Sequence, residues 1–288
     1  MKTYPGDYVL DPTGRRVVLQ DATAFAALRV AGQVAASCLD HLTSFIVPGV
    51  STAAIDRIVD TYLRDHGAIP ATLGYHGFPK SCCISPNHVV NHGIPAEDVV
   101  LHDGDIVNVD VTAIVDGWHG DTSRMYLVGD VAAPARHLVG ATYDAMMAGI
   151  AQVAPGQQLG DLGHATDAVA RRYGYSSVRD YVGHGIGRVF HDAPDIFHWG
   201  KPGRGMKLVP GMVFTVEPML NQGGPGIRQL ADGWTNITRD LSLSAQFEHM
   251  VGVTSSGVEI FTLSPAGFHC PVPPLADSFS AAPALSAF

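Results

Sequence analysis

The sequence of 288 residues contains only four cysteines, Cys38, Cys82, Cys83 and Cys270. Their spacing forms neither a disulfide framework nor the Cys-x-x-Cys pairs of a structural zinc site. This excludes a small secreted domain held together by disulfides. Free cysteines suit a reducing compartment, so we expect a cytoplasmic protein.

Long apolar runs and an excess of basic residues are also missing. The apolar segments around residues 89–90 and 106–107 end after a few residues, so we expect no membrane-spanning segment. Residues 1–20 mix charges with prolines and lack the apolar core of a secretory signal. The formal net charge of −9 argues against nucleic acid or an anionic membrane as a specific partner.

Apolar periodicity predicts four helices, over residues 22–45, 51–67, 135–153 and 159–173, with Ser51 or Thr52 as the cap of the second. A Pro-Gly pair separates the helices of each pair, and a strand-rich segment follows each pair. We interpret this order as a diverged internal duplication, although two unrelated helical hairpins would give the same pattern.

The domain organisation follows from the same pattern. Residues 1–20 form an N-terminal extension, and residues 21–264 form one domain with halves at 21–130 and 135–264. Residues 265–288 form a C-terminal tail rich in Pro, Ala and Ser. We expect residues 271–288 to lie outside the core.

The predicted strands are clearest on either side of Asp116-Gly117, where residues 105–115 and 118–128 flank a two-residue type I′ turn signal. Further strands are expected near residues 212–216, 228–230, 235–238, 245–253 and 258–263. Helices and largely antiparallel strands therefore alternate in blocks, which predicts an α+β fold.

The register of this hairpin brings two carboxylates onto one face. If Asp116 and Gly117 form the loop, Thr112 faces Asp121, and Asp110 lies diagonally from Asp121. Buried carboxylates are costly unless a cation binds them, and this spacing suits a pair of metal ions. From the hairpin alone, a turn cap for Asp121 and backbone hydrogen bonds for Asp110 explain the residues equally well.

Three later residues could complete a metal site. His184 lies among glycines in Gly183–Gly187, which lack the context of a dinucleotide-binding motif. Glu217 ends a predicted strand and Glu248 lies within another, and either could instead be a solvated edge charge. Four carboxylates and one histidine suit a two-metal site for Mn, Fe or Co ions.

The five residues and their surroundings resemble the type I methionine aminopeptidases, metallopeptidases with the pita-bread (creatinase/aminopeptidase) fold. The matching segments are Asn-Val-Asp-Val-Thr, His-Gly-Asp-Thr-Ser, Gly-His-Gly-Ile-Gly, Thr-Val-Glu-Pro-Met and Ser-Ala-Gln-Phe-Glu-His. The resemblance covers residues 25–263. Residues 74–81 and 90–95 are similar to type I members, and the short interval from Glu217 to Glu248 leaves no room for the type II insertion. The resemblance implies a pseudo-twofold duplication with a central antiparallel sheet covered by helices.

By this resemblance the protein is a dinuclear metallo-exopeptidase of protein maturation. It would hydrolyse the bond after the initiator methionine when the second residue is small. The two divalent ions (Co, Mn or Fe(II)) would be held by Asp110, Asp121, His184, Glu217 and Glu248. Glu217 would also carry protons, His191 would bind the substrate carbonyl and His92 would meet the scissile amide nitrogen. The methionine pocket would be lined by Tyr75, Phe78, Cys83, Phe190 and Trp234.

Further expectations follow from the family. A monovalent cation, Na or K, would bind near Asn87, Val89 and Ser244. Nascent polypeptide N-termini would be the substrates of a monomeric enzyme, and a ribosome contact stays open. Two alternatives also stay open: a proline-directed peptidase or dipeptidase of the same fold, and a non-catalytic binding member. Departures from the family's usual residues concern the shape of the pocket rather than the ligands, and they occur at Thr72, His88, Asn91 and Asp192.

Overall fold

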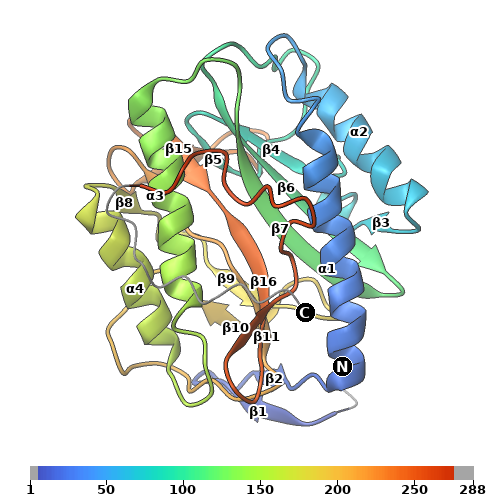
Figure 1. Cartoon of the computed structure of the whole chain (residues 1–288), viewed down its shortest axis with the longest axis vertical. Coiled ribbons are helices and arrows are strands. Elements are labelled where there is room, and N and C mark those ends of the chain that lie inside the picture. The colour runs from blue at the N-terminus through green and yellow to red at the C-terminus, as the bar shows by residue number, and fades with distance from the viewer. Residues whose placement is uncertain (1–5, 276–288) are drawn as a thin grey trace.

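Two pairs of helices cover a curved central sheet (Figure 1). The computed structural model describes residues 6–275, so residues 276–288 of the expected tail lie outside the described residues. The first pair lies over one half of the sheet and the second pair over the other half. The helices are α1 (Ala22–Leu42), α2 (Thr52–Asp65), α3 (Ala133–Ile150) and α4 (Leu159–Arg172).

The central sheet has nine strands, and every neighbouring pair is antiparallel. Its path runs β10-β9-β11-β16-β7-β6-β3, with β17 beside β16 and β4 beside β6. The strands are β3 (Ile69–Pro70), β4 (Cys83–Pro86), β6 (Ile106–Val115), β7 (Trp118–Leu127), β9 (Gly183–Gly185), β10 (Asp192–Ile196), β11 (Val213–Val216), β16 (Glu248–Val253) and β17 (Val258–Ile260).

Three smaller sheets complete the fold, together with a short 3-10 helix at Tyr75–Gly77. One is the hairpin of β1 (Tyr8–Leu10) and β2 (Arg16–Val18). The others are β8 (Ser176–Ser177) with β12 (Met219–Asn221) and β15 (Ser244–Gln246), and β5 (Val89–Asn91) with β13 (Ile227–Gln229) and β14 (Asn236–Thr238). The α+β prediction is confirmed.

The two halves repeat one arrangement, as the predicted duplication requires. The first helix pair packs on β4, β6 and β7 around one buried apolar cluster, and the second pair packs with β11, β15 and β16 around another. The halves meet in the middle of the sheet, where β16 pairs with β7 through Glu248 opposite Ser123. The junction of the two halves therefore carries two of the expected metal ligands, Asp121 and Glu248.

The predicted hairpin register is confirmed. Val115 pairs with Trp118, and Thr112 pairs with Asp121. Asp116 and Gly117 have φ angles of 50° and 79°, and a type I′ turn requires positive φ at both positions. Asp110 and Asp121 therefore lie on the same face of the two strands.

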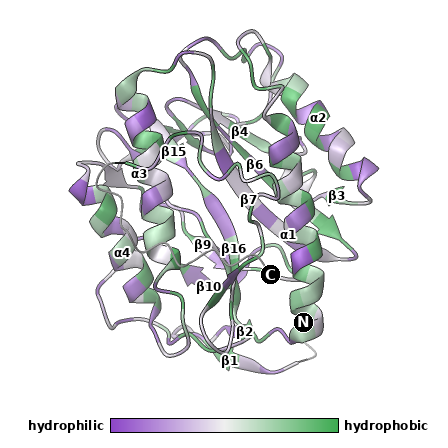
Figure 2. Cartoon of the chain, viewed as in Figure 1, coloured by the Kyte–Doolittle hydropathy of each residue, from purple (hydrophilic) through white to green (hydrophobic). Residues whose placement is uncertain are grey.

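Helix α1 is 21 residues long and, with a mean hydropathy of 1.3, apolar enough to cross a membrane. Its apolar residues are instead accounted for by the core, since Leu28, Ala31 and Leu39 are buried against the sheet. The helix backbone packs directly on Gly120 of β7, where a Cβ atom would lie 2.2 Å from the carbonyl carbon of Ala31. Hydrophobic and hydrophilic residues alternate along α2 and α4, as expected of helices with one buried side (Figure 2).

Several boundaries differ from the predictions. The third helix spans Ala133–Ile150 rather than residues 135–153. The expected strand 245–253 is two strands in different sheets, because the chain changes sheets at the buried Phe247. The first helix ends at Leu42 rather than at residue 45. The expectation that 271–288 lies outside the core is wrong at Val272, which is 8% exposed and packs in the cluster beneath α3. In the N-terminal extension, Val17 of the β1–β2 hairpin is buried in the same cluster.

Candidate active site

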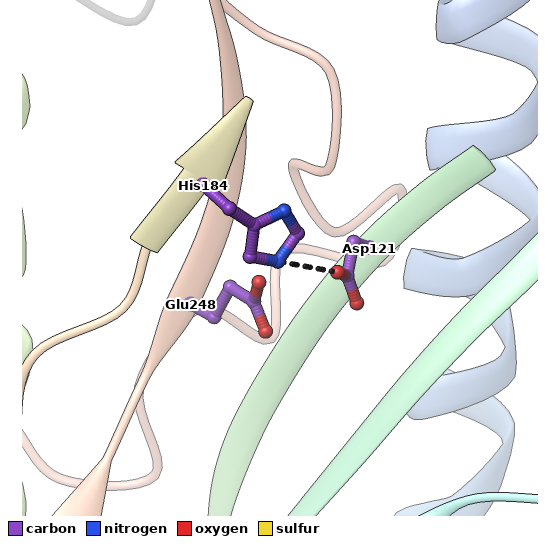
Figure 3. Close-up of side chains that lie close together, drawn as sticks. All are labelled: Asp121, His184 and Glu248. Carbon is purple, nitrogen blue, oxygen red and sulfur yellow. Dashed lines mark ion pairs between the residues drawn. The ribbon is translucent and has the colours of Figure 1, made fainter. Parts of the chain in front are cut away.

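Three of the expected metal ligands converge from three different strands. Asp121 comes from β7, His184 from β9 and Glu248 from β16, and one potential ligand atom of each lies within 4.8 Å of the others (Figure 3). The Nε2 atom of His184 is 3.6 Å from Oδ2 of Asp121. All three side chains are buried, so they form a compact group of potential metal-ligand atoms inside the protein.

The other two expected ligands lie beside this group. Glu217 follows β11 directly, and its Oε1 is 3.7 Å from Nε2 of His184. Asp110 lies diagonally from Asp121 on β6 and remains outside the 4.8 Å group. It is partly open to solvent, but it lies close enough for its charge to raise the pKa of both Glu217 and Glu248.

Ionising all four carboxyl groups at once is energetically unfavourable unless a cation is bound beside them. Burial is the first cause that raises the pKa of each, to about 7 for Asp121 and well above the ordinary value for Asp110, Glu217 and Glu248. Repulsion from the neighbouring carboxylates raises the last three further. A bound divalent cation removes both costs.

The orientation of His184 also fits a metal ion. Its Nδ1 lies 3.2 Å from the carbonyl oxygen of Gly185, so Nδ1 carries the proton and donates it there. Burial lowers the pKa of His184 to about 4, so the ring is neutral at pH 7. The Nε2 lone pair then points toward two carboxylates, an arrangement that is repulsive unless a cation lies between them.

Two threonines hold the carboxylates in place. The hydroxyl of Thr112 donates to Oδ1 of Asp121 over 2.7 Å. The hydroxyl of Thr215 donates to Oε1 of Glu217 over 2.7 Å and accepts the backbone N–H of His184 at 3.0 Å. Such partners fix the direction of metal-binding side chains, and their effect on affinity is often 10- to 100-fold, as an order of magnitude.

The expected substrate residues form two aromatic groups. In the first, the ring centroids of Tyr75 and Phe190 are 4.9 Å apart, and the Tyr75 hydroxyl is 2.9 Å from Nδ1 of His191. The His191 ring lies 4.1 Å from that of His184, which connects this group to the metal-binding atoms. Burial and the neighbouring His184 lower the pKa of His191, so its ring is neutral at pH 7.

In the second group, Trp234 contacts both Phe78 and His92, with ring centroids 5.1 Å and 6.2 Å away. Burial lowers the pKa of His92 to about 4. The remaining pocket residue, Cys83, is buried on β4 directly opposite Asp110, and burial raises its thiol pKa. A neutral imidazole, a protonated thiol and several rings make a largely apolar lining.

Three further residues belong to the site but were missed from the sequence. His119 stacks on Phe190 at 5.6 Å, and alternation along β7 places it on the same face as Asp121, a signal that could have identified it. Tyr181 contacts His92 edge-on at 5.0 Å. His198 accepts the backbone N–H of Glu217 on its Nε2 at 2.9 Å. No local pattern marks Tyr181 or His198.

The residues expected near a monovalent cation also lie together. The backbone N–H of Ser244 donates to the carbonyl oxygen of Asn87 at 2.8 Å. Val89 pairs with Ile237 in the adjoining three-stranded sheet. The Ser244 hydroxyl is buried, and no described residue hydrogen-bonds to it.

Comparison with known proteins gives the family. The model of metallopeptidase family M24 matches residues 26–255. The chain is 57% identical over 242 residues to a methionine aminopeptidase of Rickettsia prowazekii, covering 84% of this chain and 93% of the relative. It is 54% identical over 258 residues to methionine aminopeptidase B of a Synechocystis species, covering 88% and 94%.

Comparison with solved structures gives the same family. The crystal structure of methionine aminopeptidase from R. prowazekii matches with a TM-score of 0.85 and 54% identity, over 86% of this chain and all of that one. The prolidase from Pyrococcus furiosus matches with a TM-score of 0.68 at 20% identity, over 85% of this chain and 65% of that one, which shows a shared fold alone. The chain therefore belongs to metallopeptidase family M24 and is similar to methionine aminopeptidases, at up to 57% identity among the relatives named above.

Proposed function

We propose that this protein removes the N-terminal methionine from polypeptides whose second residue is small, by hydrolysis that depends on two divalent metal ions. One observation carries the proposal: atoms of Asp121, His184 and Glu248 meet within 4.8 Å, next to a set of aromatic side chains. Family membership supports a metallopeptidase, and the identity of 57% supports methionine as the residue removed.

The side chains fit the metal ions. Asp121, His184, Glu217 and Glu248 would hold one ion, and Asp110 with Asp121 and Glu248 would hold the other. Oxygen-rich ligand sets with one imidazole suit Mn, Fe(II) or Co. When bound, the ions supply Lewis-acid activation of water and of the scissile carbonyl group.

The protein's own groups then orient the substrate and move the protons. With the Tyr75 hydroxyl donating to Nδ1 of His191, the opposite nitrogen carries a proton that can donate to the oxygen of the substrate carbonyl. His92, kept neutral by burial, would contact the scissile amide nitrogen. Glu217, fixed by Thr215, would take a proton from the attacking water and pass it to the departing amine.

The methionine side chain would lie among Tyr75, Phe78, Cys83, Phe190 and Trp234. Sulfur–aromatic contacts favour a thioether in such surroundings. The natural substrates would be nascent polypeptide N-termini in the cytoplasm, acted on by a monomer. The buried hydroxyl of Ser244, to which no residue of 6–275 hydrogen-bonds, supports a monovalent cation beside Asn87 and Val89.

The test is an assay of purified, metal-stripped protein on Met-Ala-Ser and Met-Lys-Ser while Co, Mn or Fe(II) is titrated. We expect metal-dependent release of methionine from the first peptide only. An Ala-Pro-Ser peptide and the dipeptide Met-Ala test the proline-directed and dipeptidase alternatives. Cleavage of either in preference to Met-Ala-Ser would overturn the proposed specificity. No cleavage with any metal would favour a non-catalytic binding protein.

A further inference from the structure

The buried side chain of Asn236 hydrogen-bonds to three residues that surround His92. Asn236 of β14 is 2% exposed. Its Nδ2 lies 2.9 Å from Oδ1 of Asn91, 2.8 Å from the hydroxyl of Tyr181 and 2.9 Å from the backbone oxygen of Trp234. One amide group therefore connects β5, β14 and the segment that precedes β9.

Two of these partners are the residues that contact the His92 ring. Tyr181 meets it at 5.0 Å with an interplanar angle of 87°, and Trp234 meets it at 6.2 Å and 78°. Within residues 6–275 no hydrogen bond to the imidazole of His92 is found, and its backbone lies in the left-handed region at φ 54°. The orientation of the His92 ring therefore depends on its edge-on contacts with Tyr181 and Trp234.

We infer that Asn236 is a positioning residue that holds His92 against the scissile bond through Tyr181 and Trp234. The inference rests on the role proposed above for His92. The described side-chain hydrogen bonds of Asn236 reach none of the five expected metal ligands; they go to the hydroxyl of one aromatic side chain, the backbone of the other and the side chain of Asn91. Asn91, the third partner, is the residue immediately before His92: its side-chain Oδ1 accepts from the Asn236 amide, and its backbone pairs with Asn236 across β5 and β14.

Removing the side-chain amide of Asn236 would leave several groups without their hydrogen-bond partner. The hydroxyl of the half-buried Tyr181 would lose its donor, and the buried Oδ1 of Asn91 would lose its partner. The aromatic rings could then shift, and the His92 ring with them. Misplacement of a catalytic group by about 1 Å can reduce a rate on the order of 100-fold.

The experiment compares Asn236→Val with Thr238→Val. Both remove a buried hydrogen-bonding side chain from β14, but among the described residues the Thr238 hydroxyl donates only to the backbone oxygen of Ser242. For N236V we expect kcat on Met-Ala-Ser to fall by about 10- to 100-fold, with the Kd for Mn within about twofold of wild type. KM should change by a smaller factor than kcat, because Trp234 also lines the proposed methionine pocket. T238V should keep the wild-type kcat.

Tyr181→Phe keeps the aromatic ring and removes only the hydroxyl that meets Asn236. It should lower kcat by a smaller factor, and N236V/Y181F should be no slower than N236V, because both changes break the same link. Y181F also tests the link if N236V does not fold. A purely structural role would instead lower the melting temperature of N236V without this change in kcat.

The outcomes are distinguishable from failure of the proposed function. If the wild-type protein cleaves no peptide, the aminopeptidase proposal fails and this inference falls with it. If the wild type is active but folded N236V keeps the kcat of T238V, the positioning role alone is overturned. The same holds if the effects of N236V and Y181F multiply, because independent effects would show that Asn236 does not act through Tyr181.

Discussion

Thr112 and Asp121 face each other across the β6–β7 hairpin, and the threonine hydroxyl donates to Oδ1 of the aspartate over 2.7 Å. This bond leaves the other carboxylate oxygen, Oδ2, aimed at Nε2 of His184, 3.6 Å away. Thr112 thus determines which oxygen of Asp121 would be available to a metal ion.

We therefore expect Thr112→Val to weaken Mn binding by about 10-fold while the protein stays folded. The measurement is calorimetric titration of the stripped protein. Thr142→Val in α3, which removes a buried hydroxyl bonded to the backbone oxygen of Leu138, is the matched control. Equal Mn affinity in T112V and wild type would show that the bond has no role in orienting Asp121.

Metal binding should depend on pH with a definite sign. Burial raises the pKa of Asp121 to about 7 from an ordinary value of 3.8, so the folded, metal-free protein binds more protons than the unfolded chain between these values. Its stability therefore falls as pH rises from about 4 to about 7. Mn must displace these protons, so its affinity should increase over the same range.

The corresponding measurement is the melting temperature of stripped and Mn-loaded protein at pH 5, 6, 7 and 8. We expect the difference between the two to grow with pH. Calorimetry in buffers of different ionisation enthalpy should show proton release on binding at pH 6. A difference that stays constant from pH 5 to pH 8 would contradict the raised carboxyl pKa values.

Phe190 should set affinity for the methionine side chain. It is 9% exposed and lies between the rings of Tyr75, His119 and His191. Phe190→Ala should raise KM for Met-Ala-Ser by about 10-fold or more, because an apolar wall of the pocket is removed. Phe190→Leu, which keeps much of the volume, should have a smaller effect. An unchanged KM in F190A would place the methionine side chain elsewhere.

Gly120 should be essential for the contact of α1 with the sheet. A Cβ atom at this position would lie within 2.4 Å of three backbone atoms of Ala31 and Gly32, which cannot move like the end of a side chain. Gly120→Ala should lower the free energy of unfolding by at least about 2 kcal/mol, measured by urea denaturation. Gly257→Ala, with no atom within 4 Å of the added Cβ, should change it little. An equal decrease in the free energy of unfolding of G120A and G257A would be inconsistent with the close contact between α1 and β7.

Local rules were sufficient for the hairpin and for the start of α2. Asp116-Gly117 predicted both the turn type and the pairing of Thr112 with Asp121, and Ser51 accepts the backbone N–H of Ala54 as the predicted cap of α2. These features depend on residues close in sequence, where turn geometry and side-chain alternation leave few alternatives. Motif resemblance added the order of the expected ligands but no distances.

Only the tertiary structure decided how distant segments meet. Strands β11 and β16 are buried on both faces, so no alternation of polar and apolar residues revealed their register or the change of sheet at Phe247. His184 and Glu248 reach Asp121 because β9, β11, β16 and β7 pair in that spatial order. The hydrogen bonds of Asn236 to Asn91 and Tyr181 likewise join residues 145 and 55 positions apart, a proximity that no local pattern specifies.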